Sequence, residues 1–425
     1  MFRKTLGPIV AACLVLTACQ DATNPIPTSP IAGLNESDGR GFAQRLGAIG
    51  TSISAGTCSD GNVASCQNMS YVAQLIRMYD RQPTLPLISA PGCKAPFAGP
   101  IISFRRVSGE SVAAPEGTLS CAPNEPGVVL PTQNNAIPGA LTQDALSTRP
   151  EDRTDAYSSQ LYRRFLPEGL SQVSAFLSQN PKFAIIELGA NDILGIHSGV
   201  VIPGASFVPF AVWAGQYNAV LDQVGTVTRQ GLLVGLGREI SKLSSLRRGT
   251  ELWADRAAFL SAFNVDVSAN CETSANLIVV PAVVPAAVAN GLGRRAAGAG
   301  PFTLSCAEGP FNVQDRVLTP TEAAAVDAQL VQMSDHIQGQ AAARGYAFIE
   351  LEVLYGLPKP TFSVVAFMTG GAPYGPNISL DGLHPSAAGH TILANAAARA
   401  IEDRYNVGLD GAAFGISTSP SIRNP

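Results

Sequence analysis

An aspartate and a histidine stand three positions apart near the end of the chain, in the segment Asp381-Gly382-Leu383-His384-Pro385. The glycine favours a turn, and the proline suits the first turn of a helix, so His384 is expected just ahead of a helix. An acid that orients an imidazole, and an imidazole that accepts a proton, are two members of a hydrolytic triad. A second histidine, His390, follows closely, so these residues alone also leave metal ligation open.

A candidate nucleophile, Ser52, follows the apolar run 45–50. A serine hydroxyl is a weak nucleophile until a base takes its proton, and His384 is the candidate base. Asp381 would hold the imidazole in the right tautomer and stabilise its charged form. The alternative is that Ser52 is an ordinary turn serine.

Donors for a developing oxyanion have candidates as well. The backbone N–H groups of Ser52 and Gly139 and the side-chain amide of Asn191 could supply three of them. Asn191 and Asp192 could instead cap the helix that follows them. We expect Asp192 to be structural rather than catalytic.

These residues need a frame that brings them together, and the apolar periodicity predicts one. Short apolar runs predict strands, and longer stretches with apolar residues on one side predict helices. The strands are expected at 45–50, 183–188, 232–236 and 346–351, and the helices at 70–81, 158–178, 207–228, 320–344 and 386–405, with long loops over 83–131. This alternation predicts one α/β domain whose parallel sheet is covered by helices on both faces. The carboxyl ends of such strands meet at one edge, where the candidate residues can lie together.

Residues 254–317 fit this alternation poorly. They contain the uncharged run Leu277–Ala289, which is interrupted by Pro281 and Pro285 and is too short to span a membrane. The segment is either a cap or flap over the site or an ordinary buried loop.

Four short blocks of this chain resemble those of the SGNH, or GDSL-type, esterase and lipase family. The blocks are Gly50-Thr51-Ser52 with Gly56, then Gly139, then Gly189-Ala190-Asn191-Asp192, and finally Asp381-Gly382-Leu383-His384. The resemblance implies a three-layer α/β/α fold with a flavodoxin-like five-stranded parallel sheet. It also implies hydrolysis of an ester through an acyl-serine, without a metal. Phospholipids, triglyceride-like lipids, acetylated sugars and thioesters are substrate classes of the family.

One position departs from that family pattern. The family usually has aspartate before the nucleophile, whereas this chain has Thr51. A hydroxyl can still form a hydrogen bond in the turn but brings no negative charge. The GxSxG elbow of the α/β-hydrolases is absent, because the second residue after Ser52 is Ser54 and not glycine.

Composition limits the possible partners. Of the 425 residues, 46% are hydrophobic and 14% are charged, so a sizeable core is expected and global disorder is excluded. The net charge is −4 and no basic stripe is present, so we expect no nucleic-acid partner.

The N-terminus has the pattern of an export signal. Residues 1–18 combine a short basic start with an apolar run, and Leu16-Thr17-Ala18-Cys19 resembles the bacterial lipobox. We therefore expect a lipidated Cys19, a flexible tether over 19–40, a hydrolase domain over 41–407 and a tail over 408–425. This predicts a protein anchored by lipid to a membrane of the bacterial cell envelope, at the outer membrane or facing the periplasm. The alternative is an ordinary signal peptide with a chance cysteine.

Six cysteines remain after Cys13 and Cys19 are set aside. Export favours disulfides, and sequential pairing would join Cys58 to Cys66, Cys93 to Cys121, and Cys271 to Cys306. This is one of 15 connectivities. Zinc is the alternative, but the spacing offers no clustered Cys/His pattern, so we expect no metal site.

Together these features predict a serine ester hydrolase that needs no cofactor and acts on a small-molecule or lipid ester. Two alternatives stay open: a non-catalytic surface lipoprotein that binds glycan or lipid, and an acyltransferase with the same triad. The expected lipid anchor and the apolar run 277–289 favour a lipidic substrate slightly.

Overall fold

The computed structural model describes residues 39–310 and 313–408, all within one unit of the chain, Glu36–Pro425. The expected signal peptide, the lipidated Cys19, the tether up to residue 38 and the tail 409–425 lie outside the described residues. The last two residues assigned to the tether, 39 and 40, begin helix α1, Gly39–Gln44.

Four parallel strands form the central sheet, in the spatial order β1-β2-β3-β9. Their bounds are β1 Leu46–Gly50, β2 Phe183–Glu187, β3 Gln230–Gly235 and β9 Ala347–Glu350. β1 and β2 are buried along their whole length, as parallel strands usually are. Gly50 pairs with Glu187, and Gly235 pairs with Glu350, so the strands end together at one edge. The predicted parallel sheet is confirmed in this four-stranded form.

The central sheet has no fifth strand among the described residues, although residues 133–137 run alongside β1. Three backbone N–H groups join the two segments: Ala48 to Gln133 O at 2.7 Å, Asn135 to Ala48 O at 2.9 Å and Ile137 to Gly50 O at 3.1 Å. Only one isolated parallel bridge results, between Ala48 and Asn134. Pro131 and Pro138 flank the segment and have no N–H to extend a ladder.

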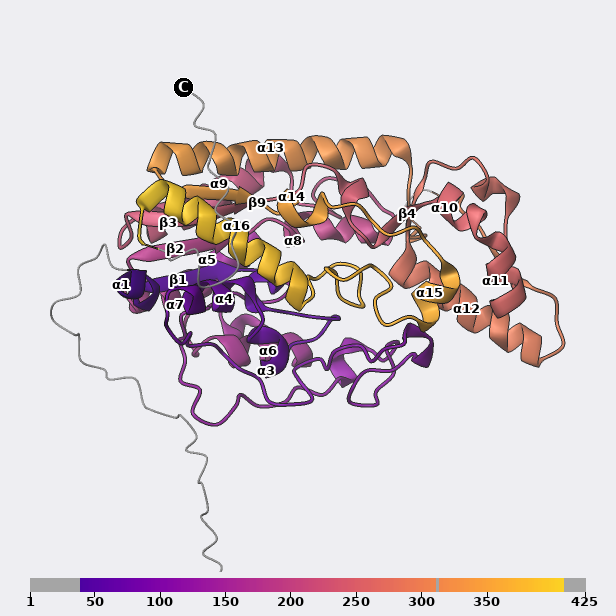
Figure 1. Ribbon diagram of the computed structural model, residues 1–425, viewed down its shortest axis with the longest axis horizontal. Helices are drawn as coiled ribbons and strands as arrows, with labels where there is room; N and C mark the ends of the chain where they lie inside the picture. The colour runs from indigo at the N-terminus through magenta and orange to yellow at the C-terminus, as the bar shows by residue number, and fades with distance from the viewer. Residues whose placement is uncertain (1–38, 311–312, 409–425) are drawn as a thin grey trace, which may run out of the picture. The chain divides into compact units, whose positions relative to one another are not determined.

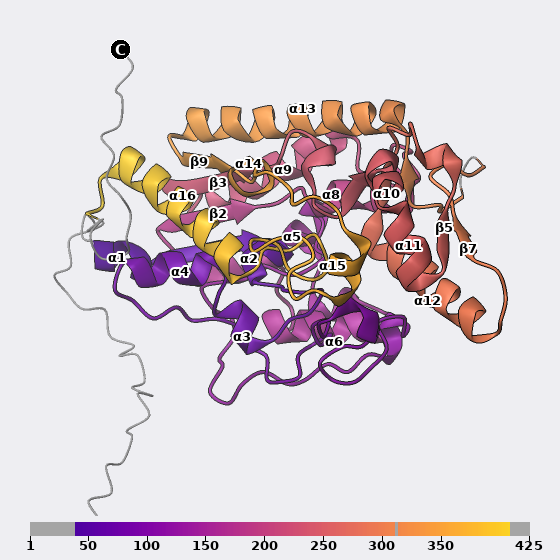
Figure 2. The same cartoon turned by 45° about the vertical axis from the view of Figure 1, so that its right-hand side comes forward.

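Two groups of helices pack against the sheet. α4, Tyr71–Met78, contacts α16, Ala387–Tyr405, and α16 lies against β9 and β3. The other group consists of α7, Gln172–Ser178, α9, Phe210–Val224, and α13, Pro320–Arg344, which contact one another in that order. In Figures 1 and 2, α13 and α16 lie on either side of strands β2, β3 and β9. The helices predicted around 70–81, 207–228, 320–344 and 386–405 are therefore confirmed.

Local sequence defines both ends of α13. Thr319 caps the N-terminus in a reciprocal arrangement with Glu322, and Pro320 occupies the first helical position. Gly345 ends the helix with a φ of 70°, in the left-handed conformation that glycine adopts without strain.

The single helix predicted over 158–178 is wrong. Two helices occupy this region, α6, Ala156–Phe165, and α7. Between them lie Pro167, which disfavours helical conformation in the residue before it, and Gly169, which has a φ of 78°. The apolar periodicity continues across the break because both helices bury one face.

Residues 246–310 and 313–318 form an insertion with its own small sheets and helices. Its elements are β4 Leu246–Arg248, α10 Gly249–Ala254, α11 Arg256–Phe263, β5 Val265–Val267, β6 Leu277–Val279, α12 Val280–Ala296, β7 Phe302–Leu304 and β8 Val317–Leu318. β4, β6 and β8 form an antiparallel sheet, and β5 pairs with β7. Figure 2 shows α11, α12, β5 and β7 side by side. The run Leu277–Ala289 becomes β6 and the first turns of α12, with Val284 and Val288 buried. The run is therefore a buried strand and a helix with one buried face, and not a loop.

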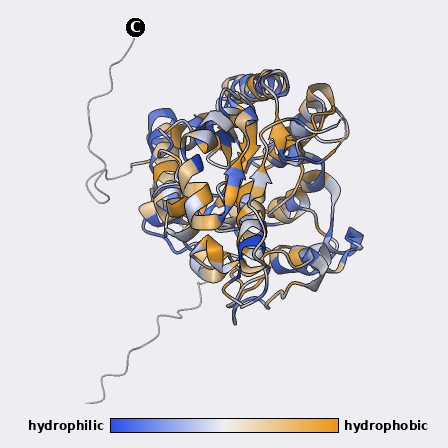
Figure 3. Cartoon of the chain, turned by 90° about the vertical axis from the view of Figure 1, so that its right-hand side faces the viewer, coloured by the Kyte–Doolittle hydropathy of each residue, from blue (hydrophilic) through white to orange (hydrophobic). Residues whose placement is uncertain are grey.

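Several short helices complete the described chain. They are α2 Ser52–Ala55, α3 Ala64–Gln67, α5 Thr142–Ser147, α8 Asn191–Leu194, α14 Glu352–Tyr355 and α15 Val364–Thr369. Figure 3 shows mostly hydrophobic ribbon where the central strands lie between the helices. Among the helices of the described residues, none has both the length and the apolar character to cross a membrane.

Candidate active site

Ser52 is the first residue of α2 and lies two positions after the last residue of β1. Thr51 between them is extended, with φ −108° and ψ −159°, and Gly56 closes the short helix with a φ of 81°. That left-handed conformation favours glycine. The turn holds Ser52 at the carboxyl edge of the sheet, where Ser52 is 8% exposed.

His384 lies between Ser52 and Asp381. Its Nε2 is 2.8 Å from Ser52 Oγ, and its Nδ1 is 2.7 Å from Asp381 Oδ2. When Nδ1–H donates to the carboxylate, Nε2 is left to accept the serine proton. The structure thus brings Ser52 and His384, which are 332 positions apart, into one hydrogen-bonded row with Asp381.

The turn that carries His384 is held by its own backbone and by two tyrosines. Asp381 Oδ1 accepts the backbone N–H groups of Leu383 and His384 at 2.8 and 2.9 Å. Tyr355 donates its hydroxyl to the Leu383 carbonyl at 2.6 Å. The turn glycine at position 382 has a φ of 75°, and a Cβ there would lie 2.5 Å from a ring carbon of Tyr374. Both its conformation and its close contact therefore require glycine.

The two ionisable members of the row shift each other's pKa in opposite directions. Burial alone would raise the pKa of Asp381, but the charge and hydrogen bonds of His384 outweigh it and bring that pKa to about 2. Burial alone would lower the pKa of His384, and the Asp381 carboxylate overcomes it, so the pKa of His384 lies above its ordinary value. Asp381 is thus ionised at neutral pH and stabilises a proton on the imidazole.

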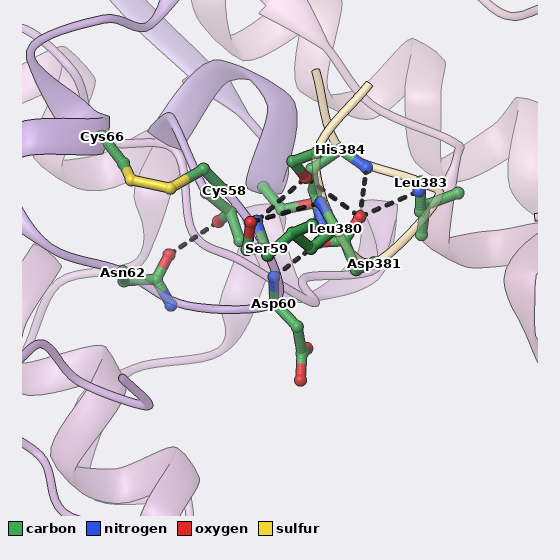
Figure 4. Close-up of polar contacts among 12 residues, drawn as sticks. Cys58, Ser59, Asp60, Asn62, Cys66, Leu380, Asp381, Leu383 and His384 are labelled. Carbon is green, nitrogen blue, oxygen red and sulfur yellow. Dashed lines mark hydrogen bonds and ion pairs between the residues drawn. A yellow bond between two sulfur atoms is a disulfide. The ribbon is translucent and has the colours of Figure 1, made fainter. Parts of the chain in front are cut away.

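A second segment holds the carboxylate of Asp381 from outside the triad. The backbone N–H of Asp60 donates to Asp381 Oδ2 at 2.5 Å, which is the oxygen that also faces His384. The backbone N–H of Ser59 donates to Ser379 Oγ at 2.9 Å. Figure 4 shows the side chain of Asp60 pointing away from Asp381, so the backbone alone makes this contact.

Two cations hold the Asp60 side chain. Lys94 Nζ lies 2.9 Å from one carboxylate oxygen, and Arg106 Nη2 lies 2.8 Å from the other. Arg106 is buried, donates to the Ala95 carbonyl at 2.8 Å and lies over the ring of Phe97. These contacts fix the side chain of the residue whose N–H reaches Asp381.

The same turn is closed by a disulfide. Cys58 and Gly61 exchange backbone hydrogen bonds of 3.1 and 2.9 Å, and Cys58 is bonded to Cys66, as Figure 4 shows. The other disulfides join Cys93 to Cys121 and Cys271 to Cys306, so the predicted sequential pairing is confirmed.

Asn191 lines the same cavity as Ser52 and His384, and Gly139 lies in the segment that Asn191 contacts. Asn191 begins α8, and its Nδ2 donates to the Ala140 carbonyl at 2.9 Å instead of capping the helix. An amide has two N–H groups, so one remains for a ligand. Gly139 lies two positions after Ile137, and the N–H of Ile137 donates to the Gly50 carbonyl. Gly139 has a φ of 77°, and the space where a Cβ would lie is open.

Asp192, which we expected to be structural, forms hydrogen bonds with Thr142. Its Oδ2 accepts the backbone N–H of Thr142 at 3.1 Å and the Thr142 hydroxyl at 2.8 Å. Burial raises the pKa of Asp192 to about 6 against these hydrogen bonds. These hydrogen bonds join α8 to the start of α5.

Glu187, the last residue of β2, was not among the predicted site residues. It is fully buried, and its carboxylate accepts the N–H and hydroxyl of Thr51 and the N–H and hydroxyl of Ser54, at 2.8–3.2 Å. Burial raises the pKa of Glu187, and these hydrogen bonds partly oppose the rise. The turn that presents Ser52 is therefore built on a buried carboxyl group.

A cavity of about 70 Å³ opens at Ser52, Asn191 and His384. Its other lining residues are mostly aliphatic: Thr51, Ile53, Ala190, Ile193, Leu194, Leu236, Gly237, Glu239, Ile240, Leu243, Leu330, Leu351, Glu352, Tyr355 and Leu383. Gly139 is not among them, and neither is any described residue of 254–317. The interpretation of that segment as a flap over the site therefore lacks support in the lining of the cavity.

Some of these contacts had a sequence signal and others had none. Glu187 is an ionisable residue inside an otherwise apolar strand, which marks a buried charge with a specific partner. The Asp60 contact is made by a backbone N–H, which no residue type reveals. His390, the possible metal ligand, is buried and accepts the backbone N–H of Tyr71 at 3.3 Å.

No cluster of three or more His, Cys, Asp or Glu side chains in the described part of the chain is arranged to hold a metal ion. In comparisons with known proteins, no family model matches this chain, and no curated protein does.

Proposed function

We propose that this chain is a serine ester hydrolase of the SGNH type that works through an acyl-serine intermediate. The observation that carries the proposal is the row Ser52 Oγ–His384 Nε2–Asp381, with contacts of 2.8 and 2.7 Å at the edge of a parallel sheet. The SGNH fold, with residues 133–137 in place of the fifth strand, is part of the same proposal. Its support is that the residues of the first, third and last blocks lie together, although they are far apart in sequence.

Acylation uses the row in order. Ser52 Oγ attacks the ester carbonyl carbon while His384 Nε2 takes the hydroxyl proton. The carbonyl oxygen becomes an oxyanion, which the N–H groups of Ser52 and Gly139 and the free N–H of Asn191 receive. His384 then gives its proton to the leaving oxygen, the carbon–oxygen bond breaks and the alcohol departs. Asp381 stays ionised throughout and stabilises the imidazolium.

Deacylation repeats these steps with water. The water oxygen attacks the acyl carbon while His384 takes a proton from the water. The N–H groups that received the first oxyanion also receive this one. The bond to Ser52 Oγ breaks, His384 returns the proton to that oxygen, and the acid is released. The mostly aliphatic lining of the cavity beside Ser52 suits the hydrocarbon part of an acyl group.

The test is a pre-steady-state assay with p-nitrophenyl esters of increasing acyl length. We expect a burst of p-nitrophenol equal to the enzyme concentration, which Ser52→Ala and His384→Ala abolish. A wild type as inactive as Ser52→Ala at every chain length would reject the enzyme and favour the non-catalytic binding protein. Transfer of the acyl group to an added alcohol in preference to water would identify an acyltransferase instead.

We also propose that the protein is anchored by lipid at Cys19 in the bacterial cell envelope. The support is the lipobox pattern at residues 16–19 alone. Mass spectrometry of the protein expressed with its full N-terminus should find acyl groups on Cys19, and Cys19→Ser should release the protein from the membrane fraction. An unmodified Cys19, or cleavage elsewhere, would leave an ordinary exported protein.

A further inference from the structure

The cavity at Ser52 contains a carboxylate that the proposed reaction does not use. Glu352 is the first residue of α14, two positions after the end of β9, and it lines the cavity together with Ser52 and His384. It therefore belongs to the same edge of the sheet as the triad. Leu351 before it and Tyr355 after it line the cavity too.

The Glu352 carboxylate has no hydrogen-bond or ion-pair partner among the residues that the structure describes. Its Oε2 is buried without a partner. A Cβ on Gly237 would lie 3.3 Å from Oε2, and a Cβ on Gly356 would lie 2.8 Å from Oε1. Two glycines thus border the carboxylate, and neither has a side chain that could donate to it.

The cations on the neighbouring segments are engaged elsewhere. Arg238, next to Gly237, binds Glu350 and Asp335 at 2.7 and 2.8 Å. Lys359 donates its Nζ to three backbone carbonyls of residues 241–246, two of them at 2.7 Å. Among the described residues no lysine or arginine lines the cavity. Its second carboxylate, Glu239 at an exposed position, has the same sign of charge as Glu352 and lies 3.9 Å from Lys242 Nζ.

A carboxylate in a mostly aliphatic cavity is costly unless a donor or a cation satisfies it. Water can bind its other oxygen, Oε1, while the cavity is empty, but an acyl chain that enters must displace that water. A purely aliphatic chain leaves the carboxylate unpaired, and an anionic chain places a second negative charge beside it. A chain whose far end is cationic or donates a hydrogen bond replaces the lost water.

We propose that Glu352 selects the acyl group, so that this cavity accepts acyl chains with a cationic or hydrogen-bond-donating end and rejects anionic ones. The proposal rests on the proposed ester hydrolysis, because the acyl chain is the part of the substrate that stays on Ser52 after the alcohol leaves. Glu352 acts on substrate choice and not on the chemistry at the carbonyl carbon.

Three p-nitrophenyl esters test this: 4-(trimethylammonio)butanoate, its neutral isostere 5,5-dimethylhexanoate, and the anionic half-ester of adipic acid. Their intrinsic reactivities cancel when the ratio of two kcat/KM values is compared between wild type and variant. We expect Glu352→Gln to lower the cation-to-anion ratio at least about tenfold, with little change for the neutral ester. Glu272→Gln, at an exposed position of the insertion, removes the same charge and should leave the ratio unchanged.

A binding measurement separates this proposal from the proposed function. In Ser52→Ala, calorimetric titration with n-pentyltrimethylammonium should show binding that the added Glu352→Gln change weakens about tenfold. Binding of this kind in a protein that cleaves no ester would overturn the hydrolase and keep the selectivity of Glu352. Ser52-dependent cleavage with the same cation-to-anion ratio in wild type and Glu352→Gln would keep the hydrolase and overturn the role of Glu352.

Discussion

Thr51 donates both its hydroxyl and its backbone N–H to the carboxylate of Glu187, at 2.8 and 3.0 Å. This contact gives a physical reason for threonine at the position before the proposed nucleophile. The SGNH pattern usually has aspartate there, and an aspartate at position 51 would set a second carboxylate against Glu187 in a fully buried place. A hydroxyl is neutral and can donate, so it suits this neighbour better than the acid does.

Thr51→Asp should therefore lower the free energy of unfolding by about 3 kcal/mol at pH 8, because two adjacent buried carboxylates cannot both stay ionised. The loss should shrink at pH 5, where one of the two can take a proton. Urea denaturation at both pH values measures it. Thr51→Ser keeps the hydroxyl and should stay close to wild type, and Thr51→Asp combined with Glu187→Gln should recover most of the stability. A Thr51→Asp protein as stable as wild type at pH 8 would contradict the pairing.

The pH dependence of hydrolysis should reflect the pKa of His384. Only the neutral imidazole can take the Ser52 proton, so kcat/KM should rise with pH through that pKa. The Asp381 carboxylate raises the pKa of His384, so the midpoint should lie above the ordinary value of about 6.5. No second step should appear near neutrality from Asp381, whose pKa is about 2.

Asp381→Asn tests the cause of that shift. Loss of the negative charge should move the midpoint to lower pH and lower kcat by about 10³–10⁴, since the imidazole also loses its orienting partner. A pH–rate profile of kcat/KM for both proteins measures the two effects. An unchanged midpoint in Asp381→Asn would mean that another group controls the pH dependence.

Removing the disulfide between Cys58 and Cys66 should lower kcat, although the bridge closes only a short loop. It closes the turn whose Asp60 N–H binds Asp381, so Cys58→Ala/Cys66→Ala should loosen the triad acid and lower kcat about tenfold or more with KM nearly constant.

The bridge between Cys271 and Cys306 in the insertion provides the matched control. From loop entropy alone, removing this bridge, with its separation of 35 residues, should lower the free energy of unfolding by about 3.8 kcal/mol. Removing the bridge between Cys58 and Cys66, with a separation of eight, should lower it by about 2.5 kcal/mol. The control pair should thus lose more stability yet keep its kcat. Equal kcat in both double variants, measured well below the lower Tm, would show that the Cys58 turn does not position the acid.

The sequence patterns predicted the residues of the candidate site better than the contacts that hold these residues in place. Ser52, Asn191 and His384 were predictable because each follows an apolar strand or precedes a helix, and parallel strands end at one edge. The contact between the Asp60 N–H and Asp381 could not be predicted, because a backbone N–H makes it and the turn has no distinctive residue type. The break at Pro167 was visible in the sequence, but the apolar periodicity of two adjacent helices concealed it.

Asn191→Ala should lower kcat by about 10²–10³ and leave KM nearly unchanged, because the amide contacts the oxyanion only as it forms. The same change removes the hydrogen bond to Ala140, so a purely structural role would appear mainly as lost stability. Thr142→Val is the control, since it removes a hydroxyl contact of the adjacent Asp192 and should cost about 1–2 kcal/mol of stability without lowering kcat. Steady-state kinetics and thermal unfolding of both variants separate the two roles. If Asn191→Ala behaves as Thr142→Val does, with lower Tm and wild-type kcat, then Asn191 holds the loop of Ala140 in place and the oxyanion depends on the backbone N–H groups alone.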